Sequence, residues 1–216
     1  MATRDEVIEC LKQNDFPRLL HIAGGTRGIF RILISLTYDK EDVVSWRAIE
    51  AIGLIAGERA KADPAGVRGL VQRILWMMRE ESGNNPWSAP EMLGEIVRNS
   101  PDEFCDIAPI IVSFHDEEIL RRGVLRAIAR ISEIRPDLVE SVLPIVGDYL
   151  RHDDVVTRFY ALLIVRRLRL TRLLSFVEAL VGDKSEAKIY EDRDFKTVSL
   201  AKIAEETVII LRTEGK

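Results

Sequence analysis

The sequence has few cysteines and no long apolar run, and these absences exclude several classes of protein. Cys10 and Cys105 have no CxxC or Cys/His spacing, which argues against a disulfide framework or redox site and predicts two buried thiols. The longest apolar runs, such as 107–114 and 208–211, are far shorter than the ~20 residues of a membrane helix. The first residues lack the apolar centre of a secretory signal, so we expect a cytoplasmic protein without a membrane span.

What the chain does contain is enough apolar and charged sequence for one ordered domain. Hydrophobic residues make up 47% of the 216 positions and charged residues 31%, a balance that favours a folded core with a solvated surface. The isoelectric point is near 5.6, which is low for a nucleic-acid-binding domain. We therefore predict a single domain over residues 1–216.

One helical segment recurs along the chain. Residues 44–53 and 85–94 match at Trp, Ala, Glu and Gly in the same order, with a period of 94 − 53 = 41 residues. Looser copies follow at 120–129 and 156–165. Helical units with periods in this range are typical of a solenoid, in which each unit buries its apolar face against its neighbours.

Capping residues predict where the helices begin. Asp42, Asp154 and the pair Asp63-Pro64 stand at N-cap positions, and Thr26 is a candidate cap for a helix over 27–38. Alternating apolar and polar residues near the C-terminus predict a small β-hairpin that covers the last repeat. We expect helical pairs at 27–59, 64–99, 101–134, 136–170 and 172–212. We expect the hairpin at about 187–198, within the last of these pairs.

The repeated segment carries a resemblance. Residues 44–53, with Asp42 two positions ahead, look like the second helix of HEAT repeats of the phycobilisome-lyase type, and the likeness covers about 27–170. The stretch 75–96 resembles uncharacterised HEAT-repeat proteins of anaerobic bacteria. The resemblance implies an all-α, right-handed α-solenoid of about five helical pairs. It also implies a scaffold that holds a protein or nucleic acid on its concave surface.

The repeat register predicts two faces on each signature helix. One is an apolar core stripe, which includes Val44, Ala48 and Ile52 in the first helix and Val124 and Ile128 in the third. Opposite it we expect a mixed aromatic and charged stripe, the candidate binding residues: Trp46, Glu50, Trp87, Glu91, Glu95, Arg122, Arg126, Arg130, Arg158 and Arg166.

The charged stripe has two interpretations, and both remain open at this point. Its glutamates and arginines can bridge neighbouring helices, and Trp46 and Trp87 can pack between repeats. Alternatively, aromatic rings beside charges form a recognition surface. The turn-rich, acidic loop 80–86 beside Trp87 is either a plain interhelical turn or the edge of that surface. Its carboxylates lack the ordered ligand spacing of a calcium loop, so we predict no metal and no cofactor.

The sequence favours a non-catalytic, protein-binding adaptor that uses the concave face, with an unidentified protein as its partner. One alternative is a nucleic-acid-binding protein related to the HEAT-like alkylpurine DNA glycosylases, which use aromatic residues in a basic groove. Another is a tetrapyrrole-handling protein like the phycobilin lyases, in which arginines would pair with propionates. Di-iron HEAT hydroxylases carry His-Glu pairs, and none of the three histidines here has an adjacent glutamate.

Overall fold

The computed structural model describes residues 3–79 and 88–214, which are helical apart from one β-hairpin. The first elements are α1 (Arg4–Lys12), α2 (Phe16–Gly24), α3 (Ile29–Ile34), α4 (Val43–Ala60), α5 (Pro64–Arg79), α6 (Ala89–Asn99), α7 (Pro101–Phe104), the 3-10 helix η1 (Cys105–Ile107) and α8 (Ala108–Val112). The remaining elements are α9 (Arg121–Ser132), η2 (Pro136–Val142), α10 (Val146–Tyr149), α11 (Val155–Arg167), η3 (Thr171–Leu173), α12 (Leu174–Glu178), β1 (Glu186–Glu191), β2 (Asp194–Ser199) and α13 (Leu200–Glu214). In the described ranges, no helix is long and apolar enough to span a membrane.

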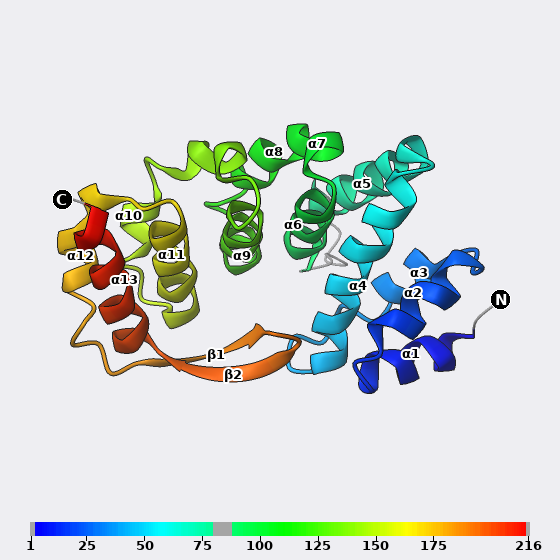
Figure 1. Ribbon diagram of the computed structural model, residues 1–216, viewed down its shortest axis with the longest axis horizontal. Coiled ribbons are helices and arrows are strands. Elements are labelled where there is room, and N and C mark those ends of the chain that lie inside the picture. The colour runs from blue at the N-terminus through cyan, green and yellow to red at the C-terminus, as the bar shows by residue number, and fades with distance from the viewer. Residues whose placement is uncertain (1–2, 80–87, 215–216) are drawn as a thin grey trace.

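The helices form a curved row, and the hairpin runs along its open side (Figure 1). Helices α4, α6, α9 and α11 make the inner layer, each packed on the next, and α13 packs on α11. Helices α5, α7 and α8 lie on the outer side of the row, while α1, α2 and α3 pack against α4 at the N-terminal end. This arrangement is the predicted α-solenoid of stacked helical units.

The core of the row is the apolar stripe predicted from the repeat register. Val44, Ala48 and Ile52 of α4, like Val124 and Ile128 of α9, are each at most 9% exposed. Because every inner helix buries such a stripe against its neighbours, the core is continuous along the row rather than gathered at one centre.

The recurring glycines of the signature let the inner helices approach closely. A Cβ atom on Gly53 would lie 2.5 Å from Glu95 Cβ, and a Cβ atom on Gly94 would lie 2.5 Å from Ala127 Cβ. A real side chain cannot occupy such space without moving a helix. The glycine positions therefore fix the spacing of α4, α6 and α9.

Aspartate caps start three helices as predicted. The carboxylate of Asp42 accepts a hydrogen bond from Val44 N at 2.9 Å, and that of Asp154 accepts one from Thr157 N at 2.9 Å. Asp63 caps α5 in the same way through Gly66 N. These bonds satisfy backbone donors that the first turn of a helix leaves free.

Other local predictions were wrong. Gly28, with φ of 79°, is the N-cap of α3, and the hydroxyl of Thr26 instead donates to Ile22 O at the end of α2. Cys10 is buried as expected, but Cys105 is exposed, because it begins the short helix η1 rather than the buried turn of a longer helix. Pro136 begins a 3-10 helix that is kinked at Val139, and not an α-helix.

The hairpin extends farther than predicted. Strands β1 and β2 are antiparallel, with Tyr190 opposite Phe195 and a two-residue turn at Asp192 and Arg193. They pack on α11 and α13, which agrees with a cover over the last repeat. The hairpin then continues across the open side of the row as far as α4 (Figure 1). The concave face is thus crossed by a strand pair from the opposite end of the chain.

Candidate functional site

The hairpin is fastened to α4 by a cluster that we call the latch: Trp46, Glu50, Tyr190 and Arg193. The Tyr190 ring stacks on Trp46 with centroids 5.6 Å apart and planes inclined by 13°. Glu50 accepts two hydrogen bonds, one from the Tyr190 hydroxyl at 3.0 Å and one from Arg193 Nε at 2.9 Å. Burial, and then the Glu50 carboxylate, raise the pKa of Tyr190, so the phenol remains a donor at neutral pH.

Backbone contacts extend the latch toward the N-terminus. Arg47 Nε donates to the Arg193 carbonyl at 2.9 Å, and Arg47 Nη1 donates to the carbonyls of Leu11 and Lys12 at the end of α1. The Arg193 guanidinium lies 3.8 Å from the centroid of the Phe16 ring, within the range of a cation–π contact. One end of the hairpin therefore joins α1, α2 and α4.

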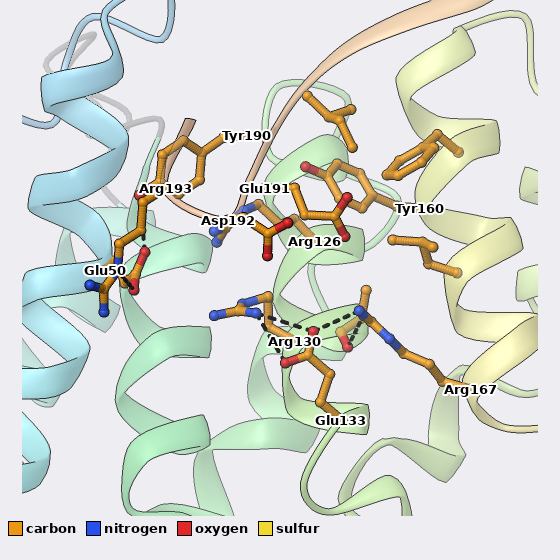
Figure 2. Close-up of a pocket in the computed structure, with 14 residues that line it drawn as sticks. Glu50, Arg126, Arg130, Glu133, Tyr160, Arg167, Tyr190, Glu191, Asp192 and Arg193 are labelled. Carbon is orange, nitrogen blue, oxygen red and sulfur yellow. Dashed lines mark hydrogen bonds and ion pairs between the residues drawn. The ribbon is translucent and has the colours of Figure 1, made fainter. Parts of the chain in front are cut away.

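The hairpin divides the concave face into two openings. The larger cleft, of about 600 Å³, lies beside the first turns of α9 and α11, where Ile119, Arg122 and Thr157 contribute to its walls. The smaller cavity, of about 210 Å³, lies beside the later turns, at Arg130 and Arg167. Figure 2 shows the smaller cavity with the hairpin turn projecting into it.

A buried carboxylate faces the larger cleft. Glu91 is only 2% exposed; its Oε1 forms an ion pair with Lys40, whereas Oε2 has no hydrogen-bond partner in the described part of the chain. A Cβ atom on Gly123 would lie 2.4 Å from Oε2, so the glycine makes room for the carboxylate. Burial lowers the pKa of Lys40, and Glu91 only partly offsets this effect. Glu91 is thus an acceptor with spare capacity at the wall of an open cleft.

A second buried glutamate is fully paired. Glu95 is 0% exposed and lies between Arg126, 3.1 Å away, and Arg130, 2.9 Å away. Burial alone would raise the pKa of Glu95, but the two guanidinium groups outweigh it and leave the pKa lowered. This ion-pair network joins α6 to α9.

The candidate binding residues lie in three different structural environments. Trp46 and Glu50 belong to the latch, and Glu91 and Arg122 line the larger cleft. Most of the others form ion pairs between neighbouring segments: Glu95, Arg126 and Arg130 as above, Arg158 with Asp183 in the loop before β1, and Arg166 with Glu206 of α13. Trp87 and the loop 80–86 lie outside the described residues.

Several residues of the face were missed in the sequence. Tyr190 and Arg193 come from the hairpin, and Lys40 precedes the first signature helix, so no repeat register includes them. The sequence of the hairpin turn did contain one indication of these contacts. A two-residue hairpin turn normally prefers Asn-Gly or Asp-Gly, whereas here the second residue of the turn is Arg193. An arginine at that position indicates that the turn makes specific contacts.

Comparisons with known proteins agree with this architecture. An engineered protein of known crystal structure superposes with a TM-score of 0.56 over 99% of this chain and 98% of its own, at 12% identity. Such a likeness shows the fold alone. The fold is an α-solenoid of stacked helical units. The archaeal HEAT-like repeats protein from Thermococcus onnurineus NA1 gives a TM-score of 0.42, with 14% identity over 99% of this chain and 98% of its own.

Sequence comparison finds an archaeal relative of this α-solenoid. An uncharacterised protein of Archaeoglobus fulgidus is 31% identical over 106 residues, which is 49% of this chain and 55% of the relative. The chain thus spans about half the length of that relative. No family model matches the sequence.

Proposed function

We propose that this HEAT-like solenoid is a non-catalytic adaptor that holds a segment of a partner protein in the larger cleft. The observation that carries the proposal is Glu91, whose Oε2 is buried and unpartnered at the cleft wall. A buried acceptor without a donor costs about 1–3 kcal/mol, so a partner that supplies an N–H or O–H group there gains a charge-assisted hydrogen bond.

The other walls of the cleft suit a protein segment. Trp46, Tyr160 and Phe195 contribute aromatic surface, and Ile119 at the rim is 64% exposed. Apolar and aromatic walls with a few convergent polar groups are typical of binding pockets, and an exposed apolar rim residue gains free energy when a partner covers it. A volume of about 600 Å³ accommodates a few side chains.

The nucleic-acid alternative receives less support. Each arginine of the predicted stripe has a carboxylate within 3.2 Å: Arg122, Arg126, Arg130, Arg158 and Arg166. The described residues thus form no continuous track of unpaired cations for a phosphate backbone along the stripe, and the isoelectric point near 5.6 is low for a nucleic-acid-binding domain. No feature of the described residues favours the tetrapyrrole alternative.

Site-specific crosslinking tests the adaptor proposal. A photoreactive benzoylphenylalanine replaces Ile119 at the cleft or, as the control, Ile209, which has the same exposure of 64% on α13. Irradiation in nuclease-treated native lysate is expected to capture a protein at position 119 and not at 209. Adding Glu91→Gln should reduce that capture at least tenfold, because an amide N–H then faces the partner's donor. Equal capture at both positions, or capture insensitive to Glu91→Gln, would rule out the cleft.

A further inference from the structure

The smaller cavity has a basic wall. Arg126 and Arg130 of α9 and Arg167 of α11, together the arginine wall, line one side of it (Figure 2). With Arg98 they share only two carboxylates, Glu95 and Glu133. Four guanidinium groups and two carboxylates leave an excess of 4 − 2 = 2 positive charges. Nη1 of Arg126, a residue only 3% exposed, forms an ion pair with Glu95 Oε1 at 3.1 Å but lacks the geometry of a hydrogen bond.

The opposite side of the cavity is acidic and comes from the hairpin. Glu191 and Asp192 at the turn project toward the arginine wall (Figure 2). Among the described residues, no ion pair joins the turn to the arginine wall, but the wall affects the pKa of a carboxyl group in the turn. The hydrogen bond from Lys196 is the main cause that lowers the pKa of Asp192, and Arg130 adds to it. The hairpin turn thus places the carboxylates of Glu191 and Asp192 opposite the arginine wall, and Asp192 is also paired with Lys196.

The backbone of the turn is held in this position at a conformational cost. Asp192 and Arg193 both have positive φ, 50° and 64°, a conformation that favours glycine and is strained for residues with larger side chains. Such strain persists only where surrounding contacts impose it. Here the contacts are those of the latch, in which Arg193 bonds Glu50. The acidic turn is therefore held over the wall by its attachment to α4.

We propose that the arginine wall binds an acidic, extended segment of the partner protein, and that the hairpin turn occupies this binding site in the free protein. The inference rests on the proposed function, because it assumes a protein partner, and it adds a second contact region and the chemistry of the segment. Opening of the latch uncovers the wall, and the segment's carboxylates replace those of the turn.

The geometry of the wall favours an extended chain. Arg126 and Arg130 are four positions apart on one helix, so they lie one turn apart, about 5–6 Å between Cβ atoms. Alternate residues of an extended strand point to the same side about 6.6 Å apart. A segment in which glutamate occupies every second position thus matches the wall, and neighbouring residues can lie against Tyr160, which also lines the cavity.

A purified system tests the inference. The probe is a fluorescein-labelled peptide, Glu-Ser-Glu-Ser-Glu-Ser, with Lys-Ser-Lys-Ser-Lys-Ser as its control. The full chain is compared with the latch-open variant Glu50→Gln/Arg193→Gln, which keeps the wall intact. Fluorescence anisotropy is expected to show at least tenfold tighter binding of the acidic peptide to the latch-open variant, weakening with added salt, and no binding of the basic peptide.

Wall variants provide the specificity control. In the latch-open background, Arg130→Gln/Arg167→Gln should weaken peptide binding at least tenfold. Arg212→Gln, which removes the same charge from an exposed site on α13, should leave it unchanged. Hydrogen exchange of the β1 and β2 amides reports whether the latch has opened.

Three results would overturn the inference. The first is equal binding to wild type and latch-open protein. The second is no binding although the hairpin amides exchange faster, and the third is a hairpin that stays protected in the latch-open variant. Because the assay needs no cellular partner, it can fail while capture at position 119 persists, and the reverse also holds.

Discussion

At the scale of single residues, the glycines of the repeated segment make the sharpest prediction. A Cβ atom on Gly53 would overlap Glu95, whereas a Cβ atom on Gly69 of α5 would meet nothing within 4 Å. Gly53→Ala should therefore destabilise the fold by about 1–3 kcal/mol through overpacking. Gly69→Ala should stabilise it by about 0.5–1 kcal/mol, because alanine loses less backbone entropy in a helix. Urea unfolding of both variants checks this, and a stable Gly53→Ala protein would contradict the close packing of α4 on α6.

The buried Glu95 predicts a pH dependence. The folded-state pKa lies below the ordinary value of 4.5, so the stabilisation from Glu95 is fully present above about pH 4.5 and is lost as the pH falls through the folded pKa. Glu95→Gln leaves the buried Arg126 without a carboxylate and Arg130 with Glu133 alone, and should cost about 3–5 kcal/mol at pH 7.

The measurement is urea unfolding at pH 7 and below pH 4.5. The difference between wild type and Glu95→Gln should shrink at the lower pH. Glu58→Gln is the control, because Glu58 pairs with Lys61 at an exposed site and should change stability by at most about 1 kcal/mol. A constant difference at both pH values would mean that Glu95 contributes through packing and not through its charge.

At the scale of elements, the hairpin is the part that sequence reasoning predicted least completely. Period-two alternation gave its existence and nearly its bounds, and the aspartate caps gave the starts of α4, α5 and α11. Both signals are local. The docking of Tyr190 on Trp46 links residues that are 144 positions apart (190 − 46 = 144), and neither the alternation nor the caps indicate such a contact.

The difference between local signals and long-range contacts also explains what the sequence could predict about the arginines of the candidate binding stripe. The register placed Arg126 and Arg130 correctly opposite the apolar core, but it could not tell pairing from exposure. That outcome depends on Glu95, which the neighbouring helix α6 supplies, and on Glu133, which caps the end of α9 itself. The arginines of the stripe are therefore paired largely within the chain.

Trp46 makes the prediction that belongs to the hairpin. Its ring stacks on Tyr190, and its indole N–H donates to the Lys40 carbonyl at 2.9 Å. Trp46→Ala should raise the population of open hairpin by up to about tenfold, since the stacked aromatic pair that joins α4 to the hairpin contributes about 0.5–1.5 kcal/mol beyond burial. Hydrogen exchange of β1 and β2 amides should accelerate, while helical circular dichroism stays unchanged.

Trp76→Ala is the matched control for that experiment, because Trp76 is 59% exposed on α5. It should leave exchange in the hairpin unaltered. Loss of helical signal in Trp46→Ala would show that the ring belongs to the core of the solenoid rather than to the latch.

At the scale of the whole molecule, the latch converts an open row of helices into a closed arc. Solenoid units normally contact only their nearest neighbours, so a solenoid bends along its length. Here Glu50, near one end, is bonded to Tyr190 and Arg193, which return from the other end. The latch-open variant Glu50→Gln/Arg193→Gln should therefore have a larger radius of gyration by small-angle X-ray scattering. An unchanged radius would mean that stacking of the inner helices alone sets the curvature.

The place of the hairpin in the chain also has a consequence for synthesis. Glu50 and Tyr190 are 140 positions apart, and at about 5–20 residues per second the ribosome needs roughly 7–28 s to add that many residues. Helices α4, α6 and α9 are complete well before β1 is made. During this interval Arg126 and Arg130 have no hairpin turn over them, and Arg167, which completes the arginine wall, is made 192 − 167 = 25 residues, or about 1–5 s, before Asp192. A nascent chain therefore offers its concave face to other proteins before the finished molecule covers part of it.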